Sequence, residues 1–536
     1  MNEPNPSNST IRREVYLGRW MALTTVVVLL GATIGCPSTK PTNSGAGNGT
    51  GSNAPSVPVT TPKSKEPVAP LADWKTPAAV FLLTGEQHGY FEPCGCSLHQ
   101  LGGMARRGDL VRLLAEERKW PVSGFDAGGT LKRNRRQDQI KFSLMFNALN
   151  HMHYAGVAAG LEELKLGADF LLQQQQELKE SVPLLGANIV LFDQADLGWP
   201  LASRVVQVGK VKVGVTAVFG NSLQEQVAPV GAMSNITFKD PAEVLPAVIK
   251  TLEAESPNFL VLISHGSEQE AKELAEKFPQ FRIILTTGGP EEPDPKPIVV
   301  GKVWILQAGH KGKRVGVLGY FPDNSVETFK FALEELDDTR FQNDPYMRKL
   351  MRDYQQQIED EGLAVSDELL LKHPSGNSFV GAAKCGECHT KAYEHWKDKT
   401  KHAHGLESLK KGHPGQEKEW VVRIHDPECL SCHVTGWEPQ QMLRFDSGYL
   451  SEKRTPLLLD QQCENCHGPG SRHVSLEEMS GANKDDLLAA RNTLKRTKEQ
   501  ARRDMCVQCH DSDNSPKFTP QAFDQYWSDV AHPWKD

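Results

Sequence analysis

The sequence lacks an excess of positive charge. Its 536 residues carry 60 Lys and Arg against 67 Asp and Glu, a formal net charge of −7, and the two signs are mixed along the chain. Proteins that bind nucleic acid need a basic surface, and electrostatic binding to a membrane needs a polybasic segment. We therefore expect no nucleic-acid partner. The length suits two or three domains.

The sequence also lacks an apolar run long enough to cross a bilayer. Its most apolar stretch, residues 20–35, is shorter than the roughly 20 residues that a spanning helix needs. Arg12, Arg13 and Arg19 precede this stretch and Cys36 follows it, the order found in an export signal. We interpret residues 1–36 as a lipoprotein signal in which Cys36 is lipidated. An uncleaved anchor and a plain secretory signal are the alternatives.

Large apolar residues are scarce in the segment that follows. Residues 37–70 are mostly Pro, Ser, Thr, Gly, Asn and Lys, so they cannot bury a core. We predict a flexible linker over residues 37–74. Together with the signal, this linker predicts an exported protein on the periplasmic or cell-envelope side, held at the membrane by a lipid anchor.

From residue 75 the sequence alternates between two periodicities. Short apolar runs typical of buried strands occupy residues 78–84, 182–190, 211–219, 259–264, 283–286, 303–307 and 315–320. Stretches with helical spacing occupy residues 104–119, 139–150, 241–254 and 268–277. This alternation predicts an α/β domain over residues 75–333.

Residues 334–378 are rich in charged residues and Gln, and we predict that they contain a connecting helix. Met347, Leu350, Met351, Tyr354 and Ile358 recur at helical spacing within this segment. Packing of this stripe on a neighbouring element is the simplest interpretation.

The remaining residues, 379–536, contain four C-x-x-C-H motifs. The paired cysteines are Cys385 and Cys388, Cys429 and Cys432, Cys463 and Cys466, and Cys506 and Cys509, followed by His389, His433, His467 and His510. Two thiols at this spacing attach to the two vinyl groups of a haem, and the next imidazole then binds its iron. The motifs predict four c-type haems in a mostly helical, loop-rich domain. Four haems in so short a segment must lie close together, which favours electron transfer from one haem to the next.

Instead of attaching haem, these cysteines could coordinate zinc or form disulfides. Structural zinc also uses paired C-x-x-C, but neither zinc nor a disulfide requires a His directly after each second Cys. Cys36, Cys94 and Cys96 lie outside the motifs. Pro93-Cys94-Gly95-Cys96 suits a redox-active or metal-binding pair, a strained disulfide or two inert thiols, and the sequence leaves these readings open.

The second axial ligand of each haem decides between electron transfer and ligand binding. A distal His closes the iron, whereas an open face allows small-molecule chemistry. The candidates in this region are His373, His395, His402, His404, His413, His425, His473 and His532. For each of them, an ordinary surface or hydrogen-bonding role is an equal alternative.

The strings around the motifs resemble the cytochrome c-554 family of tetrahaem electron carriers. They include residues 395–398, 402–409, 433–437, 467–470 and 515–520. The resemblance implies that His402 and His473 are distal ligands and that the haem of His433 is five-coordinate. The family carries another His just before the fourth motif, where this chain has Arg502 to Met505. We expect His532, more than His404 or His425, to replace it at the fourth haem.

Residues 75–333 resemble the metallophosphoesterase domain of bacterial 5′-nucleotidases, a calcineurin-like β-sandwich flanked by helices. The landmarks are residues 84–89, 102–106, 126–129, 160–163, 186–188, 263–266, 288–289 and 307–312. The family holds two metals, but here Glu86 replaces the first Asp and Gly129 the bridging Asp. Leu161 and Glu162 replace an Asn-His pair, and Pro290, Glu291 and Glu292 stand where two further His are expected.

Of the dinuclear ligands, only His88 and His265 remain. Loss of the bridging carboxylate predicts a domain without phosphatase activity. A single-metal site of Glu86, His88 and His265 is an alternative, and ordinary loop hydrogen bonding by these residues is the preferred one.

These features predict an exported cytochrome that transfers electrons to or from a redox partner protein or a small redox substrate. No catalytic residue is assigned, and an electron carrier is favoured over an enzyme. A haem enzyme acting on a small nitrogen or sulfur compound, and a working phosphoesterase fused to a cytochrome, are the rival hypotheses.

Overall fold

The computed structural model describes residues 69–93, 99–228, 235–323, 327–412 and 420–532. All of these residues belong to one compact unit, residues 66–536. Cys36, Cys94 and Cys96, the signal and most of the linker lie outside the described residues. Within the described ranges, no helix has the length and apolar character to cross a membrane.

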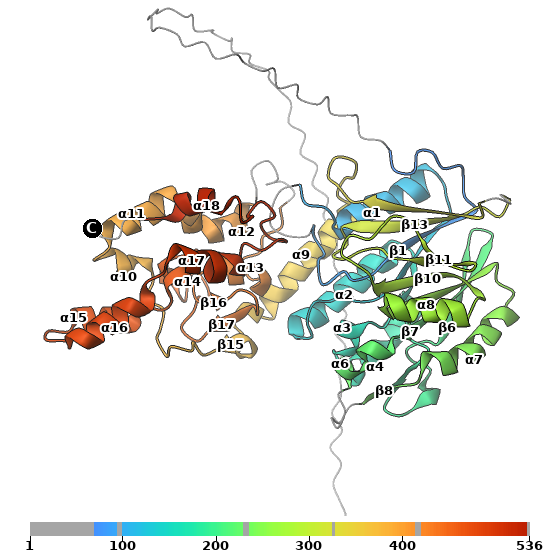
Figure 1. Cartoon of the computed structure of the whole chain (residues 1–536), viewed down its shortest axis with the longest axis horizontal. Coiled ribbons are helices and arrows are strands. Elements are labelled where there is room, and N and C mark those ends of the chain that lie inside the picture. Colours follow the sequence, from blue (N-terminus) through green and yellow to red (C-terminus); the bar gives the residue numbers. More distant parts are fainter. Residues whose placement is uncertain (1–68, 94–98, 229–234, 324–326, 413–419, 533–536) are drawn as a thin grey trace, which may run out of the picture. The chain divides into compact units, whose positions relative to one another are not determined.

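The first sheet has six strands in the order β14-β13-β1-β2-β3-β4. Their bounds are β1 Ala79–Thr84, β2 Val122–Asp126, β3 Tyr154–Ala158, β4 Leu184–Leu185, β13 Arg314–Tyr320 and β14 Phe329–Glu335. Figure 1 labels β13 and β1 of this sheet. Strands β1 to β4 pair in parallel, and β13 pairs antiparallel with β1 and β14. Along β1, Val80 and Leu82 enter one core cluster and Phe81 and Leu83 another, so both faces of the sheet are buried.

The second sheet also has six strands, in the order β11-β12-β10-β9-β7-β6. Their bounds are β6 Ser203–Val208, β7 Val211–Phe219, β9 Phe259–Ser267, β10 Phe281–Gly288, β11 Ile298–Val300 and β12 Val303–Leu306. Val213 and Ile263 of this sheet share a core cluster with Phe81 and Phe125 of the first sheet, so the two sheets pack face to face. A two-stranded ribbon of β5 Ile189–Leu191 and β8 Ile236–Phe238 lies apart from them.

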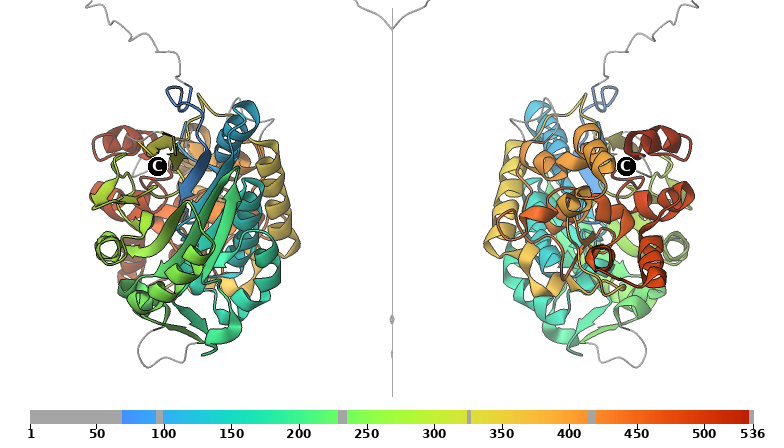
Figure 2. Two further views of the ribbon diagram at one scale, coloured as in Figure 1. Left: turned by 90° about the vertical axis from the view of Figure 1, so that its right-hand side faces the viewer. Right: turned by 90° about the vertical axis from the view of Figure 1, so that its left-hand side faces the viewer.

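Helices cover both outer faces, which confirms the predicted α/β sandwich (Figure 2). On the first sheet lie α1 Met104–Arg112, α2 Arg136–His151 and α9 Pro345–Asp360; on the second lie α7 Pro241–Ala254 and α8 Glu268–Lys277. Asp240 and Ser267 accept hydrogen bonds from backbone N–H groups at the starts of α7 and α8, which fixes where these helices begin. Short helices α3 Leu161–Leu164, α4 Ala168–Gln173, α5 Gln175–Glu180 and α6 Gln224–Val227 complete the domain.

The predicted stripe of the connecting segment lies on α9. Met347, Leu350, Met351, Tyr354 and Ile358 are buried in the same cluster as the apolar side chains of α2. Helix α9 begins after Asp344, whose carboxylate accepts from the N–H groups of Tyr346 and Met347. The stripe therefore packs on its neighbour, as its spacing indicated.

The region after α9 is helical and rich in loops, as predicted. Its helices are α10 Ala382–Gly386, α11 Thr390–Lys399, α12 Gly405–Lys411, α13 Pro427–His433, α14 Cys463–His467, α15 Ser471–Glu478, α16 Lys484–Leu494, α17 Lys498–Gln500 and α18 Phe523–Val530. A small sheet joins β15 Leu370–Leu371, β17 Leu443–Phe445 and β16 Trp437–Glu438. Its apolar cluster is much smaller than those of the α/β layers and centres on Leu406, Leu430 and Tyr449.

Candidate functional site

The four C-x-x-C-H motifs lie on short helical segments. Helices α10, α13 and α14 carry or begin the first three, and a single turn, Cys506–Gln508, begins the fourth. Among the described residues, no disulfide joins the eight cysteines of the motifs. Cysteine pairs at this spacing, each followed by an imidazole, fit covalent haem.

Three of the motif histidines are oriented through their Nδ1 atoms. Nδ1 of His433 lies 2.8 Å from the Gly405 carbonyl oxygen, and Nδ1 of His467 lies 2.6 Å from that of Leu494. Nδ1 of His510 lies 2.8 Å from Oγ of Ser515. A proton on Nδ1 that is donated to these oxygens leaves Nε2 as the lone-pair nitrogen for a metal. The donor set therefore fits haem iron.

Three motif histidines also face a second imidazole. The ring centroids are 6.4 Å apart for His389 and His473, 6.1 Å for His402 and His510, and 5.8 Å for His467 and His532. A metal–nitrogen bond of about 2 Å on each side places two imidazoles on one ion with centroids about 6 Å apart. The three separations therefore match the space that one iron occupies between two axial ligands.

The position of His532 corrects an expectation from the sequence. We expected it at the fourth motif, but it faces His467 of the third, and His402 faces His510 of the fourth. The cause is the path of the C-terminal helix: Nε2 of His395 on α11 lies 3.1 Å from the Asp529 carbonyl oxygen near the end of α18. His395, which the sequence left without a role, thus fixes the helix that precedes His532.

The other two candidates for the fourth motif lie elsewhere. His404 is exposed, and Nε2 of His425 lies 3.3 Å from a carboxylate oxygen of Glu359 on α9. Burial lowers the pKa of His402 to about 4, and the neighbouring His510 and His433 act in the same direction. His402 is therefore neutral at pH 7, which is the form that binds a metal.

The thiols of different motifs are neighbours. The Cys463 thiol of the third motif raises the pKa of Cys385 in the first, and the Cys509 thiol of the fourth raises the pKa of Cys432 in the second. Because these sulfurs mark the points of haem attachment, the first and third attachment points are neighbours, and so are the second and fourth.

Several of the landmark residues of the nucleotidase resemblance lie at the ends of the parallel strands. Thr84 at the end of β1 pairs with Asp126 at the end of β2, so the loops that follow lie together. Asp126 is fully buried and accepts hydrogen bonds from Oγ1 of Thr84 at 2.5 Å and the Gly128 N–H at 2.9 Å. Burial raises its pKa to about 6. Asn188 is likewise structural, because its amide bonds the backbone of Phe219 and Lys239.

His265 is not available as a metal ligand in this arrangement. Its Nδ1 lies 2.7 Å from the Ala127 carbonyl oxygen, and its Nε2 accepts from the Leu161 N–H at 3.0 Å. The Glu163 carboxylate accepts from the N–H groups of Gly129 and Thr130 at 3.1 and 2.7 Å. Both side chains therefore hold the loops together, as the preferred interpretation of His265 predicted.

A different set of three residues gathers at this edge. Ligand atoms of Glu86, His88 and His310 all lie within 4.8 Å of one another. Oε2 of Glu86 lies 2.9 Å from Nε2 of His88. The sequence did not single out His310 as a ligand, although it falls within the landmark of residues 307–312.

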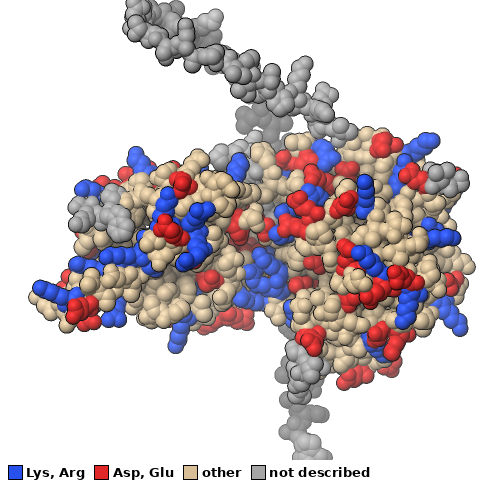
Figure 3. Space-filling model, viewed as in Figure 1, with Lys and Arg blue, Asp and Glu red and all other residues tan. Residues whose placement is uncertain are grey.

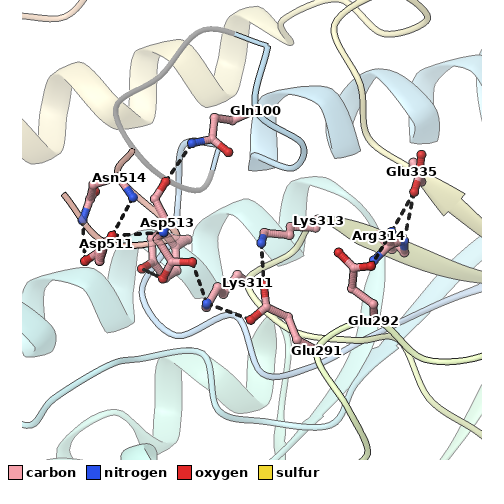
Figure 4. Close-up of polar contacts among 11 residues, drawn as sticks. Gln100, Glu291, Glu292, Lys311, Lys313, Arg314, Glu335, Asp511, Asp513 and Asn514 are labelled. Carbon is pink, nitrogen blue, oxygen red and sulfur yellow. Dashed lines mark hydrogen bonds and ion pairs between the residues drawn. The ribbon is translucent and has the colours of Figure 1, made fainter. Parts of the chain in front are cut away.

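The loops of this edge contact the segment that directly follows the fourth C-x-x-C-H motif. Asp513 lies three residues after His510, and its carboxylate pairs with Nζ of Lys311 at 2.7 Å and accepts from the Tyr90 hydroxyl at 2.9 Å. Gln100 donates to the Asp513 carbonyl oxygen at 2.7 Å (Figure 4). Lys311 also pairs with Glu291 at 2.9 Å.

Comparison with known proteins bears on the two regions separately. Residues 384–468 match the family model described as cytochrome c554 and c-prime. The match takes in the first three motifs and ends before the fourth. Cytochrome c-554 of Nitrosomonas europaea is 35% identical over 112 residues, which are 19% of this chain and 43% of that protein. The c554-like region therefore has the sequence features of a c-type haem protein.

The nucleotidase-like region matches a second group of proteins. Apyrase of Aedes aegypti is 24% identical over 300 residues, 51% of this chain and 52% of that protein. A 5′-nucleotidase precursor from Thermus thermophilus has a TM-score of 0.45 at 21% identity, covering 53% of this chain and 59% of that one. Both resemblances expected from the sequence are thus found, and the chain spans about half or less of the curated relatives it matches.

Proposed function

We propose that this protein is an exported electron carrier with four covalently bound c-type haems. The observation that carries the proposal is the set of three facing imidazole pairs at 5.8 to 6.4 Å, each containing a motif histidine. Bound haem iron supplies one-electron chemistry by cycling between Fe(III) and Fe(II). At these three haems, two imidazoles on one iron would leave no site for a substrate, which favours electron transfer over catalysis there.

The residues of the chain tune and hold these groups. The carbonyl oxygens of Gly405 and Leu494 and the Ser515 hydroxyl fix the ring orientation of three motif histidines. Burial lowers the pKa values of His467, His473 and His510 as well as that of His402, so these rings stay neutral and keep a lone pair for the metal.

The nucleotidase-like region serves as a scaffold and docking surface in this proposal. Its relatives include an apyrase and a 5′-nucleotidase, but we do not extend nucleotide hydrolysis to this chain. Gly129 carries no bridging carboxylate, and both ring nitrogens of His265 are engaged by the backbone. On the face that Figure 3 shows, basic and acidic side chains are mixed, so a redox partner would be recognised there by local patches and not by overall charge.

Anchoring through Cys36 completes the proposal. Lipidation would keep the haems on the exported side of the membrane at the end of the linker. The Cys36→Ser variant tests this: it is expected in the soluble exported fraction, whereas the unaltered protein stays with membranes. Retention of the variant in membranes contradicts a lipid anchor at this residue.

The electron-carrier function is tested by a stoichiometric reductive titration. Protein matured in an exporting host is reduced with dithionite under argon, and haem absorbance is followed. We expect four electrons per chain and no rapid reoxidation of the reduced protein by nitrite, hydroxylamine or sulfite. Fast turnover of one of these compounds would contradict the carrier and favour the haem-enzyme rival.

A further inference from the structure

The edge of the α/β layers holds a metal-binding arrangement that differs from the one its family resemblance implies. Glu86 and His88 follow strand β1, and His310 follows β12, so two separate loops bring one carboxylate and two imidazoles together. The rings of His88 and His310 have centroids 5.6 Å apart and are nearly perpendicular, at 81°. All three residues are partly buried.

Two replacements in the sequence compensate each other at this place. Glu86 has one methylene more than the Asp of the resembled family, and Gly129 has lost the bridging carboxylate. A Cβ built at Gly129 would lie 3.1 Å from Oε1 of Glu86. The longer Glu86 side chain therefore fills the space that a residue-129 side chain would take.

The backbone holds Glu86 and His88 in place in a strained conformation. Glu86 and His88 both have φ of 50°, a region that residues other than glycine rarely adopt. The Glu86 and His88 N–H groups donate to the carbonyl oxygens of Gly128 and Gly129 at 2.8 and 2.9 Å. The Lys311 N–H donates to the Glu86 carbonyl oxygen at 2.7 Å, which ties the loop of His310 to that of Glu86.

We propose that Glu86, His88 and His310 bind one divalent first-row transition-metal ion. Two imidazoles and a carboxylate are ligands suited to Zn²⁺ or Fe²⁺, whereas Ca²⁺ and Mg²⁺ prefer oxygen ligands throughout. The site is mononuclear, because Gly129 offers no bridging group and His265 bonds the backbone through both nitrogens. It uses His310, which lies outside the dinuclear set.

The ion would sit beside the contact with the fourth C-x-x-C-H motif. Lys311, which follows His310 directly, pairs with Asp513, and Tyr90, two residues after His88, donates to the same carboxylate. Binding of the ion would thus order the two loops on which this motif rests.

Zinc binding to the haem-loaded full chain tests the site. The protein is stripped with EDTA, equilibrated with Zn²⁺ by dialysis, and assayed for zinc and iron by mass spectrometry. The Cys94→Ser/Cys96→Ser variant is the background, so that these thiols cannot bind the ion. We expect one zinc per chain, and at least about tenfold weaker binding in His310→Ala and in Glu86→Gln.

The exposed His99, which pairs with Asp338, provides a matched control, and His99→Ala should bind zinc as the background does. Unchanged haem spectra and melting temperatures identify variants that fold normally. X-ray absorption at the zinc edge should give nitrogen and oxygen neighbours, imidazole scattering and no sulfur. No bound zinc in the background, or undiminished binding in a folded His310→Ala, would overturn the proposal.

Discussion

At the scale of the residue, histidines divide into those that spacing identifies and those that the fold brings together. His389, His433, His467 and His510 follow their cysteine pairs directly, so the motif alone reveals them. Tertiary structure sets which second imidazole faces three of them. The sequence placed His532 at the fourth motif, but α18 returns along α11 and delivers it to the third.

The His402→Ala variant should affect one haem and leave the others intact. His402 faces His510, so its removal opens one axial position and converts about one quarter of the iron from low spin to high spin. Electron paramagnetic resonance of the oxidised protein measures the change. His404→Ala is the matched control, because His404 is exposed two residues away and faces solvent. Equal spectra for the two variants would contradict the pairing of His402 with His510.

Asp126 predicts a pH dependence of stability. Burial raises its pKa to about 6, above the ordinary value of about 4, so the folded protein keeps this proton to higher pH than the unfolded chain does. The stability that the protonated group contributes is present below about pH 4 and is lost as the pH rises through 6.

The Asp126→Asn variant cannot ionise at this position, so it does not lose stability there as the pH rises. The stability of the variant relative to the unaltered protein should therefore rise between pH 4 and pH 7, by at most about 3 kcal/mol. Urea unfolding followed by tryptophan fluorescence gives the difference at each pH. A stability difference that is flat or falls over this range would contradict the raised pKa.

At the scale of the element, the sequence predicted the bounds of capped helices more accurately than the bounds of strands, which were predicted from apolar runs. The stretches 241–254 and 268–277 match α7 and α8, because Asp240 and Ser267 cap their first turns. The apolar run 182–190 was predicted as one strand, but it forms β4 and β5. The break falls at Asn188, whose side chain bonds the Phe219 backbone and draws the chain across to β7.

Helices α2 and α13 are joined by an ion pair in which the lysine is buried and the glutamate is partly buried. Nζ of Lys141 lies 2.6 Å from Oε2 of Glu428, and the Lys141 side chain is 5% exposed. Lys141→Met leaves Glu428 without its cation and should destabilise the folded protein by about 3 kcal/mol, since a lone buried charge is costly. Thermal unfolding measures the loss.

The double variant Lys141→Met/Glu428→Gln should recover most of that stability, because the carboxylate that loses its cation is then removed as well. The exposed pair of Lys212 and Glu255 supplies the control: Lys212→Met should cost less than about 1 kcal/mol. A loss of similar size at both lysines would show that burial of the Lys141 pair is unimportant.

At the scale of the whole molecule, the sequence predicted two regions of different chemistry but not how they join. Arg133 and Arg135 donate to the carbonyl oxygens of Gln440 and Gln441, and Lys311 pairs with Asp513. None of these contacts has a signature in the sequence, because each joins residues some 200 to 300 positions apart. The gathering of Glu86, His88 and His310 escaped prediction for the same reason.

The two regions therefore make one molecule in which the fourth haem motif rests on the loops of the nucleotidase-like edge. Through this contact, Tyr90 and Lys311 of the α/β region hold Asp513, which lies in the loop that follows His510. The haem region itself has only a small apolar cluster, so covalent haems would supply much of its interior.

The count of haems per chain tests the central claim most directly. Protein matured in an exporting host is quantified by amino-acid analysis, and its haem is measured by the pyridine haemochrome method after acid–acetone extraction has removed any non-covalent haem. The account predicts four covalently held haems per chain. Fewer than four in fully matured protein, or zinc in place of haem iron at the C-x-x-C-H motifs, would contradict it.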